Sequence, residues 1–418
     1  MMQPRLWLRT RWRRIILIMA VIGPGLITAF ADNDAAGVAT YSVSAALYGY
    51  GMLITLIPVT IVLGLTQEMG ARLAIVTQKG LADLIREYYG VKVAVAIFII
   101  LFLVNFAVIL QNVSGIKSSL ELFGLNPVIF LPLIIGLLFI FIISTKYNTI
   151  EKFFFILIVF YLTYVASAIM AKPDWNLALK SLIIPPANTF NPRYVFTAVA
   201  VLGTTITAWG QFFIHSYIRD KQIPLEHLKY SQWEVYLGAI LTDIFSFFIM
   251  IAVAATLFVN KIQIADATSA ALAIKPFAGE FAGVLFGAGL LVAGLLGCII
   301  VPLTTAYAFS EFFGFSGSLD EDFRKSKLFY SLFIIQILAA LFVVLLPHMS
   351  LFRITLAANF LNGMILPVIF FFVYQFTNKK TIMNSHTNNT LQNALLIISG
   401  IVISVAAIVG SIGGWIWK

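Results

Sequence analysis

The stretch GPGLITAFADNDAAGVATYS, residues 23–42, decides the fold, because it places polar side chains inside an otherwise apolar run. Asp32, Asn33 and Asp34 stand at its centre, beside Gly37. Polar groups at the depth of a bilayer are costly and usually mark a pathway or a binding partner. Neither flank reaches the roughly 20 apolar residues that a spanning helix needs, so a loop between two spans explains the stretch poorly. We therefore expect a helix that is interrupted near the middle of a membrane.

The composition of the whole chain supports a membrane setting. Of 418 residues, 61% are hydrophobic and 11% are charged, and the mean hydropathy is +0.97. Soluble domains carry roughly a quarter charged residues. Soluble enzymes, secreted disulfide scaffolds and disordered proteins are therefore excluded. Cys298 is the single cysteine and has no intrachain partner, and the four histidines form no cluster at metal-ligand spacing.

Eleven apolar runs are long enough to cross a bilayer. The polar segments between them are too short for a soluble domain, so we expect one all-α polytopic membrane domain over residues 1–418. The runs cover residues 15–47, 51–76, 93–116, 126–145, 152–171, 194–218, 234–259, 281–311, 328–347, 353–377 and 392–417.

The positive charges predict the orientation of the chain in a cell membrane. The opening residues MMQPRLWLRTRWRR hold five arginines and no cleavage signal, so we interpret them as a retained cytoplasmic tail. Nineteen of the 27 Lys and Arg residues fall on the same side as this tail. The positive-inside rule then places the N-terminus in the cytoplasm and, after eleven spans, the C-terminus outside. The basic excess thus reflects topology, and no nucleic-acid partner is expected.

A second interruption is predicted in the sixth run, VFTAVAVLGTTITAWGQFFIHS, residues 195–216. A packing face of small residues would explain this segment equally well on its own. Interruptions in both the first and the sixth span, however, are typical of an inverted repeat of five plus five helices. We expect repeats over about 15–171 and 194–377, with an extra helix at 392–417. The small and polar residues concerned are Gly203, Thr204, Thr205, Thr207, Gly210 and Gln211.

These segments resemble the NRAMP divalent-metal transporters. The resemblance rests on residues 23–42, on LYGYGMLI at 47–54, on QEMGARLAIVTQKGLADLIREYYG at 67–90, and on the end of the sixth run at His215 and Ser216. It implies a LeuT-like fold in which a cation binds midway between broken helices one and six. The whole chain would then be a single transport domain.

The resemblance also implies a set of cation ligands. Asp34 matches the family's aspartate, Ala31 supplies a carbonyl three residues earlier, and Thr205 matches the carbonyl of the sixth helix. Two ligands are missing, because Gly37 stands at the family's asparagine and Ala208 at its methionine. Thioethers select softer metals, whereas Mg²⁺ takes oxygen ligands and keeps much of its water. The pattern is similar to the NRAMP-related magnesium transporter branch.

Other polar positions are weighed beside these ligands. Asn359 aligns with a family glutamine near the metal, and Gln211, three residues after Ala208, is expected to face the same cavity. Asp32 fits a vestibule role and a structural role equally well. Asn362, one turn after Asn359, fits a site role and a helix-packing role equally well, and His215 is expected to be structural. The other positions are expected to hold helices together or to line the inner exit: Glu68, Arg72 and Asp243.

The third run bears on proton coupling. Its sequence, AIFIILFLVNFAVILQNVSG at 96–115, contains no acid, and Asn112 lies at about the position of a family glutamate. Gly210 likewise replaces a family histidine. A divalent ion that moves inward gains about 4.6 kcal/mol per 100 mV, which drives uptake without a proton. We expect no obligatory proton coupling.

The expected function is therefore a secondary transporter or facilitator that imports divalent cations, Mg²⁺ first and Mn²⁺ also. The alternative is a proton-coupled Mn²⁺/Fe²⁺ importer of the usual NRAMP type. A sodium-coupled amino-acid carrier on the same fold is less favoured, because Asp34 would face the substrate carboxylate. No enzymatic activity, cofactor or obligate protein partner is expected; the partners are the divalent ion and the lipid bilayer.

Overall fold

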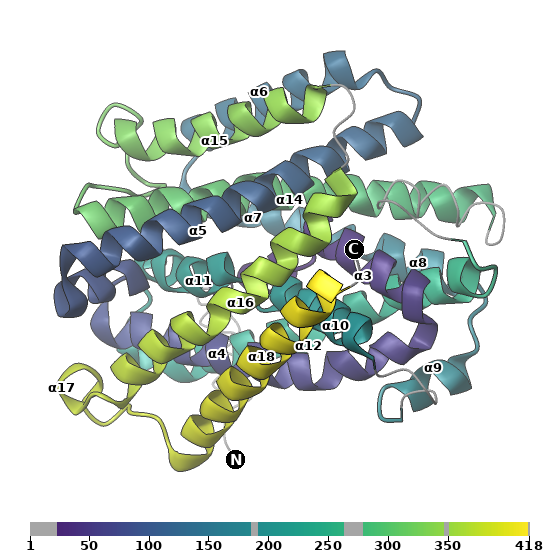
Figure 1. Ribbon diagram of the computed structural model, residues 1–418. Helices are drawn as coiled ribbons and strands as arrows, with labels where there is room; N and C mark the ends of the chain where they lie inside the picture. The colour runs from purple at the N-terminus through teal and green to yellow at the C-terminus, as the bar shows by residue number, and fades with distance from the viewer. Residues whose placement is uncertain (1–22, 185–190, 263–278, 347–350, 417–418) are drawn as a thin grey trace, which may run out of the picture.

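The computed structural model describes residues 23–184, 191–262, 279–346 and 351–416, and all regular structure in these ranges is helical. Figure 1 labels most of the elements. In chain order they are α2 (Pro24–Ala31), α3 (Ala35–Tyr48), η1 (Gly49–Thr55), α4 (Leu56–Thr77), α5 (Leu81–Leu122), α6 (Pro127–Ser144), α7 (Tyr147–Val159), α8 (Leu162–Met170), α9 (Trp175–Ser181), α10 (Pro192–Thr205), α11 (Ala208–Lys221), η2 (Leu225–His227), α12 (Leu228–Val253), η3 (Ala254–Phe258), α14 (Glu280–Phe313), α15 (Lys327–Leu345), α16 (Leu351–Asn378), α17 (Lys380–Met383) and α18 (Thr390–Ile416).

The predicted class, an all-α polytopic membrane protein, is confirmed. Ten helical segments among the described residues are long and apolar enough to cross a membrane. The first of them, Ala35–Thr77, contains residues 35–47 of the first predicted run and all of the second. Most described residues of every predicted run are helical, and the interruptions at 32–34 and 206–207 are the main breaks in the first and sixth runs. Residues 15–22 of the first run, and the five arginines before it, lie outside the described residues.

Both predicted interruptions are present. Between α2 and α3 the chain turns at Asp34, whose ψ of 178° is extended and whose side chain accepts a hydrogen bond from Gly37 N. Between α10 and α11 it turns at Ile206 and Thr207, and the Thr207 side chain accepts a hydrogen bond from Gly210 N. A side-chain oxygen at such a position satisfies a backbone donor that has no partner within the helix. The second half of each broken helix, α3 or α11, therefore begins on a polar cap that the sequence supplies.

The broken helices lie at the centre of the bundle. The segment that contains α10 and α11 has 89% of its most apolar window buried, whereas the windows of α6 and α18 are 22% buried. In Figure 1, α6 and α15 form an outer layer beside the long helices α5 and α14. The halves of the broken helices, α2, α3, α10 and α11, contact α4, α5, α12, α14 and α16, and α10 also contacts α18. The single thiol, on Cys298 of α14, is fully buried.

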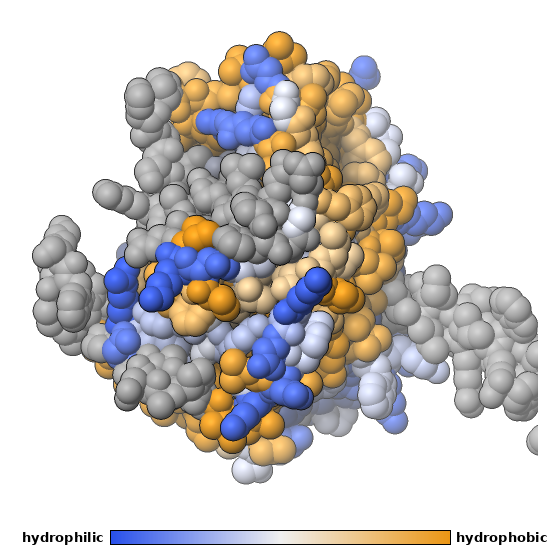
Figure 2. Space-filling view, turned by 90° about the vertical axis from the view of Figure 1, so that its right-hand side faces the viewer, coloured by the Kyte–Doolittle hydropathy of each residue, from blue (hydrophilic) through white to orange (hydrophobic). Residues whose placement is uncertain are grey.

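The surface divides into apolar flanks and a polar end. Figure 2 looks onto the end where α8 and α9 lie and shows hydrophilic side chains gathered there beside hydrophobic flanks. Along α6 the large side chains that face outward are aliphatic, among them Ile129, Leu133, Leu137 and Ile140. This division is the one that a bilayer imposes on a bundle of spanning helices.

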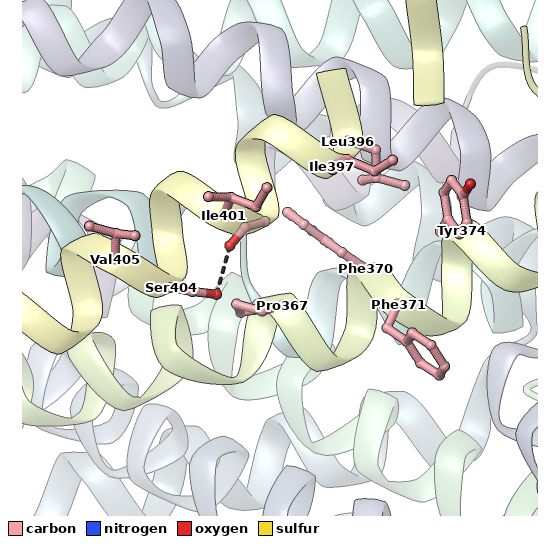
Figure 3. A pocket seen from close by; sticks show the side chains of 10 residues that line it. Pro367, Phe370, Phe371, Tyr374, Leu396, Ile397, Ile401, Ser404 and Val405 are labelled. Carbon is pink, nitrogen blue, oxygen red and sulfur yellow. Dashed lines mark hydrogen bonds between the residues drawn. The ribbon is translucent and has the colours of Figure 1, made fainter. Parts of the chain in front are cut away.

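Two cavities border the C-terminal helix α18. The one in Figure 3 lies between α16 and α18, measures about 330 Å³ and is lined mainly by apolar side chains such as Phe370, Leu396 and Ile401. The other, about 550 Å³, lies between α4, α10 and α18. Ser404, the polar side chain drawn in Figure 3, donates to the Gly400 carbonyl of its own helix. Walls with so few oxygen ligands do not suit a cation, so the site must be sought elsewhere.

Candidate cation site at the two broken helices

Asp34 is the anionic centre of the first interruption. It is only 2% exposed, its Oδ1 accepts from Gly37 N at 2.9 Å, and its Oδ2 accepts from Asn112 Nδ2 at 2.7 Å. A carboxylate offers about four lone-pair directions, so two remain after these bonds. Within the described ranges, no Lys or Arg nitrogen lies within 4.0 Å of its oxygens. The carboxylate is held in place but is not neutralised.

Asn112 orients this carboxylate from α5. Besides its bond to Asp34, its Nδ2 donates to Val108 O at 3.0 Å, and its Oδ1 accepts from Ala35 N at 2.9 Å. One amide thus fixes the Asp34 side chain and also satisfies a backbone donor at the start of α3. From the sequence, Asn112 is expected only to stand at about the position of a family glutamate, and it is not among the predicted ligands. The available signal was its position, a polar side chain in an apolar run.

The predicted carbonyl ligands lie at the last residue of the first half of each broken helix. Ala31 ends α2, and its carbonyl accepts from Asp34 N at 3.0 Å. Thr205 ends α10, and its Oγ1 lies 2.6 Å from the Tyr41 hydroxyl of α3. The carboxyl end of a helix carries partial negative charge that favours cations. The structure brings Ala31 and Asp34 together; Thr205 is joined to α3 through Tyr41, with no hydrogen bond to Asp34 among the described residues.

Gly37 is a donor to the carboxylate in this structure. Its N–H points at Asp34, and a Cβ built on it would collide with the Asp32 carbonyl. An asparagine, which the resemblance places at this position in relatives, does not fit this backbone without a shift. The absence of a side-chain ligand here therefore belongs to the local packing of the interruption.

Ala208 begins α11 and is fully buried. Its N–H donates to Asn362 Oδ1 at 2.8 Å, so a side-chain amide of α16 satisfies a backbone donor at the start of α11. The methyl group of Ala208 offers no ligand to a cation. Asn362, for which the sequence leaves a site role and a packing role open, contacts the start of α11 at the second interruption.

Asn359 lies one turn before Asn362 on α16 and faces α3. Its Nδ2 donates to Thr40 Oγ1 at 2.6 Å, while its buried Oδ1 has no hydrogen-bond partner within the described ranges. Thr40 follows Asp34 by six residues, which is about 9 Å along a helix. Its Nδ2 also lies 3.5 Å from the Ala36 carbonyl, so the free oxygen of Asn359 is placed near the first turns of α3.

Gln211 lies on the opposite side of the interruption. It is one turn into α11, and its Nε2 donates to Thr66 Oγ1 of α4 at 3.3 Å. Asp32 is close to the same two helices, since Thr207 donates to its Oδ1 at 3.2 Å and Gln67 to its Oδ2 at 3.4 Å. Gln211 is thus grouped with Asp32, and no hydrogen bond joins it to Asp34 in the described part of the chain.

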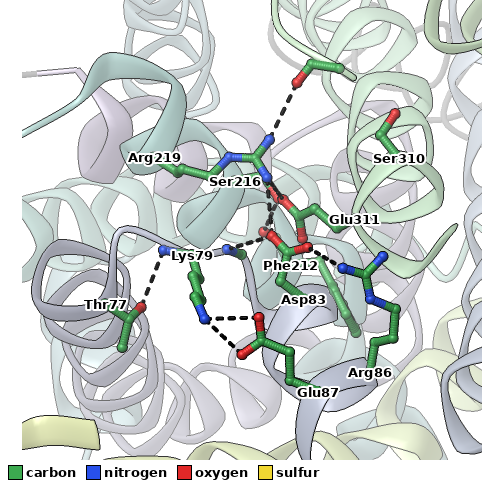
Figure 4. A network of polar contacts seen from close by, with 12 residues as sticks. Thr77, Lys79, Asp83, Arg86, Glu87, Phe212, Ser216, Arg219, Ser310 and Glu311 are labelled. Carbon is green, nitrogen blue, oxygen red and sulfur yellow. Dashed lines mark hydrogen bonds and ion pairs between the residues drawn. The ribbon is translucent and has the colours of Figure 1, made fainter. Parts of the chain in front are cut away.

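Ion pairs join three helices at the end of the bundle where α11 finishes. Arg219 Nη1 lies 3.2 Å from Asp83 Oδ2 and 3.1 Å from Glu311 Oε1, and Ser216 donates to the same Glu311 oxygen at 2.6 Å (Figure 4). These residues come from α5, α11 and α14. Nearby, Glu234 of α12 accepts from the first backbone donors of α2. Both α2 and α11 are therefore joined to neighbouring helices at this end.

The remaining polar positions make contacts within or between helices, and Glu68 also accepts from Gln232 of α12 at 2.7 Å. Asp243 accepts from Thr60 at 2.5 Å, and Arg72 pairs with Glu68 at 2.8 Å. His215 Nδ1 lies 2.6 Å from the Gln211 carbonyl of its own helix. None of these side chains hydrogen-bonds to Asp34 among the described residues.

Comparisons with known proteins identify the family and relatives of the chain. The family model described as natural resistance-associated macrophage protein-like (Nramp) matches residues 25–412. The divalent metal cation transporter MntH of Klebsiella pneumoniae subsp. pneumoniae is 25% identical over 407 residues, which cover 95% of this chain and 94% of that protein. MntH of Verminephrobacter eiseniae is 23% identical over 319 residues, 70% of this chain and 69% of that protein.

Solved structures share the fold. The crystal structure of the Eremococcus coleocola manganese transporter in complex with an aromatic bis-isothiourea substituted compound has a TM-score of 0.75 and 17% identity, covering 94% of this chain and 85% of that one. The crystal structure of MhsT in complex with L-phenylalanine has a TM-score of 0.61 and 14% identity, covering 95% and 97%. These likenesses confirm the expected LeuT-like arrangement.

Proposed function

The chain belongs to the Nramp family, and from this premise we propose that it is a secondary transporter of divalent metal cations. The relatives named MntH are divalent metal cation transporters. The observation that carries the proposal is Asp34, a buried carboxylate without a basic partner among the described residues, at a point where two helices are interrupted. Buried charges in proteins are paired or coordinate metals. The predicted ligands are Asp34 with the carbonyls of Ala31 and Thr205, supported by Asn359.

We infer that Mg²⁺ is the preferred ion and that Mn²⁺ is also carried. Support comes from Ala208, which replaces a sulfur ligand with a methyl group, and from Gly37, which has no side chain. What remains are oxygen ligands, which suit a hard cation that keeps part of its water.

A manganese importer coupled to protons is the second candidate. The Eremococcus coleocola structure is that of a manganese transporter, which favours Mn²⁺. The side chains around Asp34 favour uncoupled transport, because Asn112 is an amide that does not release a proton and Gly210 has no side chain. We propose uncoupled uptake driven by the membrane potential and the ion gradient.

The direction is proposed to be inward across the cell membrane, through a single transport domain with repeats over about 15–171 and 194–377. The end of the bundle near Arg219 is then cytoplasmic, as are the N-terminus and the tail that precedes α2, and the C-terminus is outside. In support, basic residues collect at that end, where α11, α12, α15 and α17 have their termini: Lys79, Arg86, Lys221, Lys229, Lys327, Lys379 and Lys380.

Uptake into proteoliposomes tests the function. The purified chain is reconstituted with an ion-sensitive dye inside, and Mg²⁺, Mn²⁺ and Cd²⁺ are added in turn. We expect saturable uptake of Mg²⁺ and Mn²⁺, with Cd²⁺ competing no more strongly than Mg²⁺ itself. Uptake of Mn²⁺ with none of Mg²⁺ would favour the second candidate, and uptake of none of these ions would contradict divalent transport.

A further inference from the structure

A ring of polar side chains surrounds Asp32 between α2, α4 and α11. Asp32 Oδ1 accepts from Thr207 of α11, and its Oδ2 accepts from Gln67 of α4. The neighbouring Thr66 of α4 accepts from Gln211 of α11, one turn beyond Thr207. Residues four apart share a face of a helix, so Thr207 and Gln211 both face α4 and Asp32. All five side chains are at most 4% exposed.

Two acceptors in this ring have no hydrogen-bond partner. Gln67 Oε1 and Gln211 Oε1 are buried, and neither receives a hydrogen bond from any described residue. An unsatisfied buried polar atom costs about 1–3 kcal/mol. Amide oxygens left free beside a carboxylate are the ligands that a hard divalent cation takes.

The charge of Asp32 is also uncompensated. Within the described ranges no Lys or Arg nitrogen lies within 4.0 Å of its oxygens, although Asp34 stands two residues away. Buried carboxylates without a partner are strongly destabilising, so the arrangement favours a cation between them and the surrounding oxygens.

The spacing of the oxygens fits coordination. Asp32 Oδ1 and Thr207 Oγ1 are 3.2 Å apart. Adjacent ligands of an octahedral ion with bonds of about 2.1 Å are separated by about 3.0 Å. Gly210 keeps this space open, because a Cβ built there would lie 2.6 Å from Thr207 Oγ1 and 3.4 Å from Asp32 Oδ1.

We propose that Asp32, Gln67, Thr207 and Gln211 form a second coordination position, which a divalent cation occupies after it leaves Asp34. This proposal rests on the proposed transport function and adds a stage to it. The position lies toward the end of the bundle near Arg219. The helices α4 and α11 finish side by side at that end, where Gln78 Nε2 donates to Ile223 O at 3.0 Å. An ion that moves from Asp34 toward that end passes the Asp32 ring before it reaches Arg219.

Uptake kinetics and equilibrium binding test the second position. The probe is Mn²⁺, counted after equilibrium dialysis of the full chain in nanodiscs. We expect Asp34→Ala to retain weak Mn²⁺ binding and the double variant Asp34→Ala/Asp32→Asn to lose it. In proteoliposomes, Asp32→Asn should lower kcat for Mn²⁺ uptake by about tenfold or more, while KM changes by less than about threefold, because Asp34 still loads the ion.

Asn105→Ala is the control for the loss of a buried polar side chain. Asn105 is fully buried on α5 and donates to Thr305 Oγ1 at 2.9 Å, and no hydrogen bond joins it to the ring among the described residues. Its kcat and its Mn²⁺ binding should stay near those of the wild type. Gln67→Leu, which keeps the charge of Asp32, should lower kcat in the same direction and serves if the aspartate variants fail to fold.

Two results would overturn the second position while leaving the proposed function intact. One is wild-type kcat in both Asp32→Asn and Gln67→Leu. The other is residual Mn²⁺ binding by Asp34→Ala that persists unchanged when Asp32 is also replaced. If the wild-type chain itself binds and transports no divalent ion, the proposed function fails along with it.

Discussion

At Asp34, two hydrogen bonds fix the carboxylate before any cation arrives. Gly37 N donates to one oxygen and Asn112 donates to the other, so these two hydrogen bonds fix the side-chain rotamer of Asp34 and the directions of its remaining lone pairs. A ligand fixed in advance loses little entropy on binding, which strengthens binding without a new contact. The amide of Asn112 is therefore part of the site even where it does not touch the ion.

Replacing Asp34 tests its role as the only anionic ligand at the position between the two broken helices. We expect Asp34→Ala to abolish Mg²⁺ and Mn²⁺ uptake in proteoliposomes. The lost N-cap should also cost about 1 kcal/mol of stability. Asp174→Ala is the control, because Asp174 caps α9 in the same way, accepting from Leu177 N at 3.0 Å. Wild-type uptake by a folded Asp34→Ala protein would refute the assignment.

The positioning role of Asn112 has its own test. Asn112→Ala leaves Ala35 N and Asp34 without their partner, and we expect a loss of about 1–3 kcal/mol in stability together with a raised KM for uptake. Asn105→Ala removes a buried amide from the same helix, where it donates to Thr305 at 2.9 Å. That variant should lose stability but keep its KM. Equal KM values in the two variants would contradict a role for Asn112 at the site.

Selectivity is tested at Ala208. Ala208→Met places a thioether at the start of α11 and should increase the preference for Cd²⁺ over Mg²⁺ in competition uptake. Ala208→Leu adds a similar volume without sulfur and should leave the preference for Cd²⁺ over Mg²⁺ unchanged. Gly37→Asn is a poor companion change, because its side chain meets the Asp32 carbonyl. A preference that rises equally with leucine would show that size, not sulfur, governs it.

At the scale of elements, the interruptions are stabilised by polar groups from neighbouring helices. α2 has eight residues and receives its N-terminal acceptor from Glu234, α3 from Asn112, and α11 from Asn362. Short helices are marginal on their own, because nucleation is costly. Beside the local caps Asp34 and Thr207, these acceptors come from residues that are distant in the sequence, so each half-helix also depends on the packing of α5, α12 and α16.

The ion pairs in Figure 4 predict a difference in stability between two cationic residues. Arg219→Gln leaves the buried Glu311 without its cation, and we expect a loss of about 1–3 kcal/mol, reduced from the fully buried case because Arg219 is partly exposed. Lys79→Gln removes an exposed pair with Glu87 and should cost less than about 1 kcal/mol. Thermal unfolding in detergent measures both. A smaller loss for Arg219→Gln than for Lys79→Gln would contradict a stabilising network.

At the scale of the whole molecule, transport of a doubly charged ion without a proton should carry net charge. With the potential clamped, Mn²⁺ uptake into liposomes that hold a pH-sensitive dye should proceed without acidifying the lumen. An inside-negative potential of 100 mV adds about 4.6 kcal/mol, enough for a concentration ratio of roughly a thousandfold. Acidification that scales with uptake would return the chain to the coupled class.

The sequence predicts those features of the whole molecule that local composition encodes. Apolar runs gave the spans, and Asp32, Asn33 and Thr207 marked the interruptions, since polar groups in a bilayer must be enclosed. The contacts of Asn112 and Asn362 could not be derived in this way. Asn112 meets a residue 78 positions earlier and Asn362 one 154 positions earlier, and no local period carries that information. The sequence does not decide between a vestibule role and a structural role for Asp32, because the hydrogen-bond partners of its side chain come from two other helices.

The burial of Cys298 gives the chain a practical property. Its thiol is enclosed within α14, and the sequence contains no other cysteine. Thiol-reactive maleimides therefore meet no exposed target in the native protein, and the unmodified chain is a silent background for labelling. A cysteine introduced on either side of the interruptions would report by its alkylation rate when that side opens to water. The opening of each end could then be followed separately, without first removing a native thiol.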